Sequence, residues 1–196
     1  MAVKSLAPRF EALLSADLAL VDVSDLLPAR RAPRREVSRI RKVYVRHSGV
    51  PGRVGLAGVE VHTALALRAY RGPCAPGHYW LAADPLIDLD WPTAVLRTAP
   101  DDWRAPHTGG RADTHGLGIV VQGDLDVAPM STFQRLALAA LLSRLRKTYA
   151  QQLDADWLCW ERGLSATGRQ RSSGSHLVGW LQAYAAEMAQ ELAAAI

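Results

Sequence analysis

The chain has 196 residues, of which 49% are hydrophobic and 21% charged, and its formal net charge is +4 at pH 7. This size and composition predict one globular domain, with or without an extension, and exclude disordered, fibrous and membrane-embedded classes. No apolar run approaches the roughly 18 to 20 residues that span a bilayer, and four acidic residues fall among the first 30. We therefore expect no signal peptide and no membrane partner, with synthesis in the cytoplasm.

Residues 1–40 are predicted to form a basic extension, or arm, that precedes the main domain. A short amphipathic helix is expected around Arg9–Leu20, and Pro28 and Pro33 argue against its continuation. The Arg-rich segment Ala29–Lys42 suits phosphates, anionic wall polymers or an acidic protein partner, and it also suits a solvated linker. Nucleic acid is a weaker alternative, because no aromatic residues interleave the arginines.

Residues 41–196 are predicted to form one α/β domain, in which a mixed central β-sheet is flanked by helices. The expected strands are Lys42–His47, Gly77–Asp84, Leu86–Trp91, Gly116–Asp124 and, as another central strand, Ala155–Trp160. The expected helices are Gly58–Tyr70, Pro129–Gln152 and His176–Ala195. The second of these is the clearest, because Ser131 and Thr132 offer an N-terminal cap before a regular apolar face.

Polar residues recur at the ends of these elements in a characteristic order. His47 ends the first strand in RKVYVRHSG, and His78 and Tyr79 open the next in PGHYWLAAD. His107 then precedes the glycine-containing strand GLGIVVQGD, and Gln134 lies at the start of the long helix. Taken together, these pieces resemble the type 2 N-acetylmuramoyl-L-alanine amidases, whose fold is shared by phage lysozyme-type amidases and peptidoglycan recognition proteins. The resemblance covers roughly 41–181.

The resemblance implies a zinc ion held by two His and one Cys or Asp, with a water in the fourth position. His47 matches the first ligand. The second ligand position reads Trp160, and the third most nearly matches Ser173. Indole cannot ligate zinc, and a neutral serine hydroxyl is a poor ligand beside a thiolate or carboxylate. The resemblance therefore implies a degenerate zinc site without a metal cofactor.

Other family positions map onto residues that suit contact with sugar or peptide. The catalytic tyrosine of the family corresponds to His78, with Tyr79 alongside, and a basic residue of the phage enzymes corresponds to Arg171. A residual binding groove would contain His47, His107, Trp160 and Ser173. For each histidine, a purely structural hydrogen-bonding role stays open.

The leading hypothesis is a pseudoenzyme with the amidase-like fold. It would bind peptidoglycan at the cell wall, or act as a structural part of a phage tail or phage-derived particle, docking through its Arg-rich arm. The alternative is an active, endolysin-like zinc amidase with a rearranged metal site. His47, His78 and His176 are the candidate ligands for that site, since all three lie at element ends.

Overall fold

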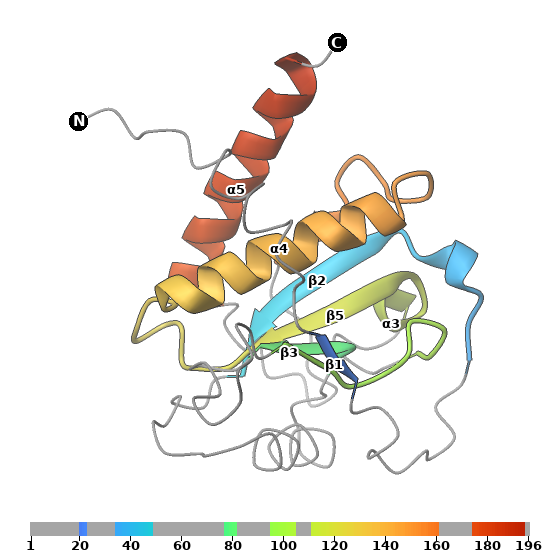
Figure 1. Ribbon diagram of the computed structural model, residues 1–196, viewed down its shortest axis with the longest axis horizontal. Helices are drawn as coiled ribbons and strands as arrows, with labels where there is room; N and C mark the ends of the chain where they lie inside the picture. The colour runs from blue at the N-terminus through green and yellow to red at the C-terminus, as the bar shows by residue number, and fades with distance from the viewer. Residues whose placement is uncertain are drawn as a thin grey trace.

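The computed structural model of the chain describes residues 20–22, 34–48, 77–81, 95–104, 111–160 and 174–194. In these ranges a β-sheet is covered by helices (Figure 1), so the predicted α/β class is confirmed. The strands are β1 (Leu20–Asp22), β2 (Lys42–His47), β3 (Tyr79–Leu81), β4 (Val95–Arg97), β5 (Gly116–Val121) and β6 (Leu158–Cys159). The helices are the 3₁₀ turn η2 (Val37–Arg39), α3 (Arg111–His115), α4 (Thr132–Thr148) and α5 (Ser175–Ala194).

The six described strands form one mixed sheet in the order β1-β4-β3-β5-β2-β6. Neighbouring strands run parallel except β3 and β4, which are antiparallel. All of β5 is buried between β3 and β2. Because β2 and β5 are parallel and in register, with His47 opposite Val121, both strands end at the same edge of the sheet.

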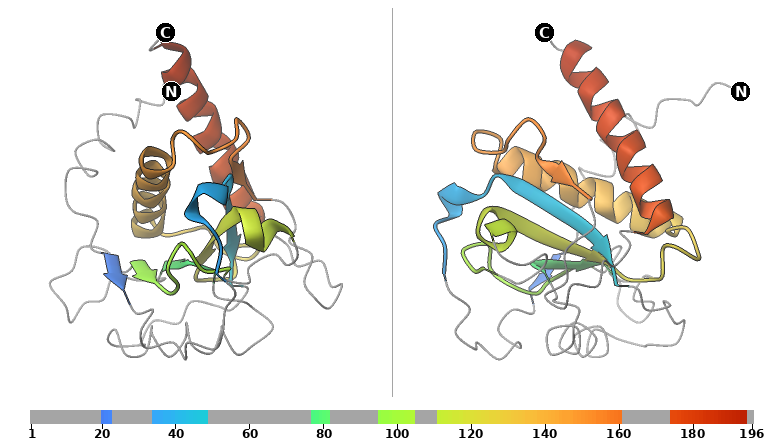
Figure 2. Two further views of the ribbon diagram at one scale, coloured as in Figure 1. Left: turned by 90° about the vertical axis from the view of Figure 1, so that its right-hand side faces the viewer. Right: turned by 180° about the vertical axis from the view of Figure 1, so that it is seen from behind.

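One face of the sheet packs against α4. Side chains alternate between the two faces of a strand, and the residues of β2 and β5 that enter the hydrophobic core are Val43, Val45, Leu117, Ile119 and Val121. From α4, buried leucines at helical spacing meet them: Leu138, Leu141, Leu142 and Leu145. Figure 2 shows α4 along one side of the sheet. His47 has the same parity as Val43 and Val45, so its side chain leaves β2 on this face.

The predicted cap of α4 is present as a complete capping box. The hydroxyl of Ser131 accepts a hydrogen bond from the backbone N–H of Gln134 (3.1 Å), and Oε1 of Gln134 accepts one from the N–H of Ser131 (3.1 Å). Gln134 also donates through Nε2 to the carbonyl oxygen of Gln122 at 2.7 Å. It thereby ties the start of α4 to the end of β5.

The predicted C-terminal helix is also present, as α5. Its first turns enter the core through Leu177, Leu181 and Tyr184, and the ring of Tyr184 stacks on Trp180 with centroids 5.3 Å apart. The rest of α5 projects away from the sheet (Figure 1). No helix among the described residues is long and apolar enough to cross a membrane.

Two expectations about strands differ from the structure. The segment Ala155–Trp160 was predicted as a central strand, but β6 is two residues long and lies at the edge beside β2. Both of its residues are only half-buried, because one side of the strand has no neighbour in the described sheet. The short strands β1 and β4 were not predicted. The expected helix Gly58–Tyr70 and strand Leu86–Trp91 lie outside the described residues.

The described part of the predicted arm contacts the main domain closely. The backbone N–H of Arg35 donates to the carbonyl oxygen of Asp102 at 2.7 Å, and Arg34 pairs with the side chain of Asp102. β1 also falls within residues 1–40 and forms the far edge of the sheet beside β4. Nearly all of the expected helix Arg9–Leu20 lies outside the described residues, and its last residue, Leu20, begins β1.

Candidate functional site

The imidazole of His47 is buried at the end of β2, with 7% of its side chain exposed. The backbone N–H of Leu125 donates a hydrogen bond to Nδ1 of His47 at 2.9 Å. Leu125 belongs to the turn that follows β5, and parallel pairing brings this turn to the end of β2. The contact between His47 and the turn therefore follows directly from the sheet topology.

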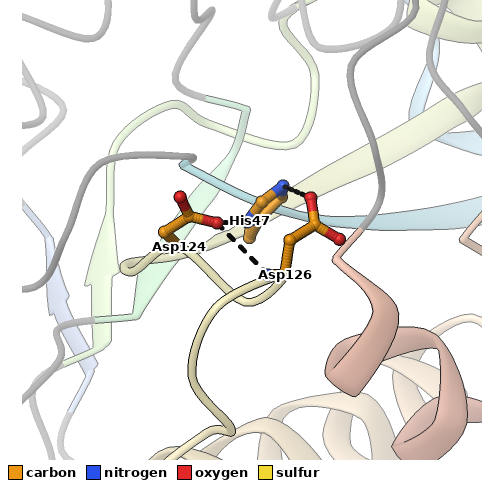
Figure 3. A group of neighbouring side chains, drawn as sticks. All are labelled: His47, Asp124 and Asp126. Atoms are coloured by element: carbon orange, nitrogen blue, oxygen red, sulfur yellow. Dashed lines mark hydrogen bonds and ion pairs between the residues drawn. The ribbon is translucent and has the colours of Figure 1, made fainter.

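Two carboxylates of the same turn lie beside the ring (Figure 3). Asp124 Oδ1 is 3.9 Å from Nδ1 of His47, and Asp126 Oδ2 is 3.9 Å from Nε2. One donor atom from each of the three residues can be chosen so that all lie within 4.8 Å of one another. Among the described residues, this is the one group of three or more His, Cys, Asp or Glu side chains close enough to share an ion.

The start of α5 lies against the same turn. We call the place where the end of β2, the turn Gly123–Asp126 and the start of α5 meet the His47 corner. Asp126 Oδ1 accepts the backbone N–H of Ser175 at 2.9 Å, and the carbonyl oxygen of Leu125 accepts the N–H of His176 at 3.1 Å. A carboxylate is favourable at this position, because the first N–H groups of a helix lack partners within it and carry partial positive charge. The end of β2, the turn after β5 and the start of α5 thus converge on Leu125.

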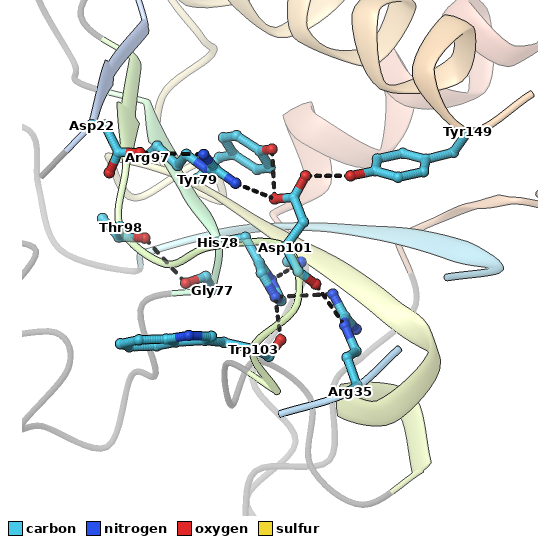
Figure 4. A network of polar contacts seen from close by, with 11 residues as sticks. Asp22, Arg35, Gly77, His78, Tyr79, Arg97, Thr98, Asp101, Trp103 and Tyr149 are labelled. Carbon is cyan, nitrogen blue, oxygen red and sulfur yellow. Dashed lines mark hydrogen bonds and ion pairs between the residues drawn. The ribbon is translucent and has the colours of Figure 1, made fainter. Parts of the chain in front are cut away.

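His78 lies in a second, separate cluster (Figure 4), where it is fully buried. The backbone N–H of Gly118 donates to Nδ1 of His78 at 3.0 Å, so the proton of the neutral ring is on Nε2. Nε2 donates to the carbonyl oxygen of Trp103 at 2.9 Å, and the guanidinium of Arg35 lies 3.0 Å from the same nitrogen. Each ring nitrogen of His78 is therefore engaged by the protein itself.

Tyr79 belongs to the core beside this cluster. Its hydroxyl donates to Asp101 Oδ1 at 2.8 Å, and the hydroxyl of Tyr149 donates to the other oxygen of the same carboxylate (Figure 4). Burial, reinforced by Asp101, raises the pKa of Tyr79 well above its usual value. With 4% of Tyr79 exposed, its hydroxyl stays protonated and points into the protein rather than into a groove.

The fold has clear counterparts among solved structures. The amidase endolysin LysCS from Clostridium intestinale aligns with 84% of this chain and 93% of its own at 16% identity and a TM-score of 0.51. The Ph2119 endolysin from a Thermus scotoductus bacteriophage aligns with 85% and 98% at 16% identity and a TM-score of 0.57. Human PGRP-IβC, in complex with glycosamyl muramyl pentapeptide, aligns with 81% and 93% at 16% identity and a TM-score of 0.54.

The chain has the amidase and peptidoglycan recognition protein fold. The likeness is structural, since no protein-family model and no curated protein sequence matches the chain. The resemblance read from the order of the motifs is therefore confirmed as a resemblance of fold.

The amidase fold raises the question of whether the corner at His47 fits a zinc ion. A neutral imidazole has one nitrogen with a free lone pair, and at His47 that nitrogen is Nδ1, which accepts the N–H of Leu125. Nε2 then carries the proton. A metal at Nδ1 would take the place of the Leu125 N–H, and a metal at Nε2 would move the ring proton onto Nδ1, against that same N–H.

The carboxylates of this corner are also engaged by backbone donors. Asp126 holds the N–H of Ser175, and Asp124 Oδ1 accepts the N–H of Asp126 at 3.2 Å. The donor atoms are close enough for one ion, and a carboxylate that accepts one N–H can still bind a metal through its other lone pairs. The misfit lies in His47, because the one lone pair of its neutral ring holds the turn through Leu125. In this arrangement the described residues do not fit a zinc ion at His47.

The structure does not assemble the metal site predicted from His47, His78 and His176. His78 precedes β3, and its backbone N–H donates to the carbonyl oxygen of Gly118 in β5. His47 is paired with Val121, three residues further along β5. Three residues along a strand correspond to roughly 10 Å. His176 does lie in the corner through its backbone N–H, but its side chain is exposed.

The remaining predicted site residues divide into two groups. Trp160 follows β6, is half-buried and packs against the hydrophobic core, so its role in a groove stays a prediction. His107, Arg171 and Ser173 lie outside the described residues, and their roles also stay predictions.

Sequence reasoning missed Asp124 and Asp126. Both lie in the turn Gly123–Asp126, shortly after β5 ends at Val121, and the end of a parallel strand lies at the same edge as the end of its neighbour. That rule, applied to β2 and β5, is the signal that would have placed the two carboxylates beside His47.

Proposed function

We propose that this chain is a peptidoglycan-binding domain that has the amidase fold and does not hydrolyse its ligand. The observation that carries the proposal is the hydrogen bond from Leu125 to Nδ1 of His47. This bond occupies the lone pair of Nδ1, through which a catalytic metal would bind the neutral ring. No second imidazole or thiol of the described residues lies close enough to share an ion with His47.

Peptidoglycan is the ligand class that the comparisons favour. Two of the similar structures are endolysins, one of them named as an N-acetylmuramoyl-L-alanine amidase, and a third holds a glycosamyl muramyl pentapeptide. A fold that serves both for cleaving and for binding wall fragments can lose its metal and keep its binding surface. In this account His107, Trp160, Arg171 and Ser173 are the candidate contact residues.

Docking to a protein partner through the Arg-rich arm is less favoured. Arg35 is buried, with 8% exposed, and Arg34 pairs with Asp102. Arg35 therefore binds the chain itself rather than an external surface, while Arg34 is exposed and paired with Asp102. A role in a phage-like particle would have to use other residues of the segment.

Sedimentation with insoluble peptidoglycan tests the proposal. Chitin is a matched control, because it is an insoluble N-acetylglucosamine polymer without peptide stems. We expect the full chain to sediment with peptidoglycan and to stay in the supernatant with chitin. Protein that stays in the supernatant with both polymers would contradict wall binding and favour an assembly role.

An active amidase is the second candidate, and the grouping of His47, Asp124 and Asp126 is the observation in its favour. It predicts that the purified chain carries close to one equivalent of zinc. Elemental analysis of the protein, prepared without chelators, separates the two candidates.

A further inference from the structure

Leu125 is the point at which three parts of the fold are joined. Its N–H donates to His47 at the end of β2, and its carbonyl oxygen accepts from His176 in the first turn of α5. The residue is 2% exposed and belongs to the hydrophobic core. Both backbone groups of this one turn residue are therefore satisfied by other elements.

The end of β2 holds the turn at two adjacent positions. Besides the bond from Leu125 to His47, the N–H of Gly123 donates to the hydroxyl of Ser48 at 3.0 Å, and Ser48 Oγ lies 3.3 Å from the carbonyl oxygen of Gly123. The Leu125 and Gly123 groups are buried or partly buried. An unpaired N–H at such a site is costly, so each bond restrains the path of the turn.

The turn Gly123–Asp126 also fixes where α5 begins. Asp126 accepts the N–H of Ser175, and Gly174 packs so closely on the turn that a Cβ there would lie 2.8 Å from Cβ of Leu125 and 3.4 Å from Cγ of His47. Gly174 has φ +82°, a conformation that side-chain-bearing residues rarely adopt. The start of α5 therefore has little freedom once the turn is in place.

We propose that His47 is a positioning residue: its Nδ1 holds the turn Gly123–Asp126, and through that turn it sets the start of α5. The resemblance to amidases implies a metal bound by His47. Here Nδ1 of His47 instead accepts a hydrogen bond from the N–H of Leu125. The candidate contact residues Ser173 and Arg171 come one and three residues before Gly174 in the sequence and lie outside the described residues. The proposal does not depend on peptidoglycan binding.

Two substitutions separate a positioning role from a ligand role. In asparagine, Oδ1 is the same number of bonds from the backbone as Nδ1 of histidine, so His47→Asn keeps an acceptor for the Leu125 N–H. In glutamine, Oε1 is one bond further away, near the place of Nε2, so His47→Gln removes that acceptor. Neither amide replaces imidazole as a zinc ligand.

The test is amide hydrogen exchange, followed by NMR on the full chain without added ligand or metal. We expect exchange at Leu125 in His47→Asn to stay within about threefold of the wild type. In His47→Gln it should rise at least about tenfold, together with exchange at Ser175 and His176. His47→Ala should match His47→Gln if it folds; the Asn variant carries the test if it does not.

The nitrogen shifts of the His47 ring give an independent reading. We expect a proton on Nε2, none on Nδ1, and no change when zinc or a chelator is added. Equal protection in all three variants would show that the bond does not position the turn. A zinc-dependent shift of the ring nitrogens, with equal loss of protection in the Asn and Gln variants, would overturn the proposal in favour of a metal ligand.

Discussion

The guanidinium of Arg35 donates to the carbonyl oxygen of Gly116, the first residue of β5, at 2.6 Å. Nε of Arg35 donates to the carbonyl oxygen of Asp101 at 2.9 Å, and the residue is 8% exposed. Arg35, from the Arg-rich segment, thus donates hydrogen bonds to backbone carbonyl groups at one end of the sheet.

Replacing this arginine should destabilise the fold. Arg35→Ala leaves several carbonyl oxygens without donors, and we expect a loss of about 3 kcal/mol in the free energy of unfolding. The neighbouring Arg34 is the control: its side chain is 73% exposed, and an exposed ion pair contributes less than about 1 kcal/mol. Urea unfolding of both variants measures the difference, and equal midpoints would contradict the buried role of Arg35.

Alkaline pH should destabilise the protein through Tyr79 and Tyr149. Burial, reinforced by Asp101, raises the pKa of both hydroxyls above the ordinary value of 10.0. The folded state therefore keeps both protons at a pH where the unfolded chain loses them. This stabilisation is fully present below pH 10 and is lost as the pH rises above it.

Urea unfolding between pH 8 and pH 11 measures this dependence. Tyr149→Phe removes one of the two groups, so its stability should fall less steeply with pH than that of the wild type. The same slope in both proteins would show that Tyr149 ionises equally in the folded and unfolded states.

Two glycines of the C-terminal region should respond to alanine in opposite directions. Gly174→Ala places a Cβ 2.8 Å from Cβ of Leu125 at φ +82°, and we expect a loss of about 2 kcal/mol. Gly179 lies inside α5, and a Cβ added there would meet no atom within 4 Å, so alanine should raise the free energy of unfolding by up to about 1 kcal/mol. Thermal unfolding of the two variants gives the comparison, and a lower melting temperature for Gly179→Ala would contradict it.

The two residues of the α4 capping box, Ser131 and Gln134, should contribute unequally to the free energy of unfolding. Ser131→Ala removes one acceptor at an exposed position and should cost about 1 kcal/mol. Gln134→Ala also leaves the buried carbonyl of Gln122 without its donor, so we expect a loss of about 2 kcal/mol or more. If denaturant unfolding shows the two variants to be equally stable, the bond to Gln122 contributes nothing.

The elements predicted correctly are those with local signals. β2 and β5 have apolar patterns typical of strands, α4 has its cap and apolar face, and α5 has leucines at helical spacing. β1 and β4 have three residues each, too few for a period to appear. Their pairing with each other is specified by neighbours far away in the chain.

The candidate site was predicted in part, through His47. The partners of His47 come from the turn after β5 and from the start of α5, and only the pairing of β2 with β5 brings them together. For His78, a histidine beside a strand suggests chemistry from the sequence alone, whereas in the structure its ring nitrogens contact Gly118, Trp103 and Arg35. Burial of Arg35 likewise depends on carbonyl groups that its own segment does not contain.

We propose above that the chain binds peptidoglycan and does not hydrolyse it at His47. The most direct measurement incubates the full chain with insoluble peptidoglycan and one equivalent of zinc, then assays both the sedimented protein and the soluble muropeptides. We predict that the protein sediments and that muropeptide release does not exceed the buffer control. Release that requires zinc and is abolished by a chelator and by His47→Asn would show that the chain is an active amidase with His47 as a metal ligand.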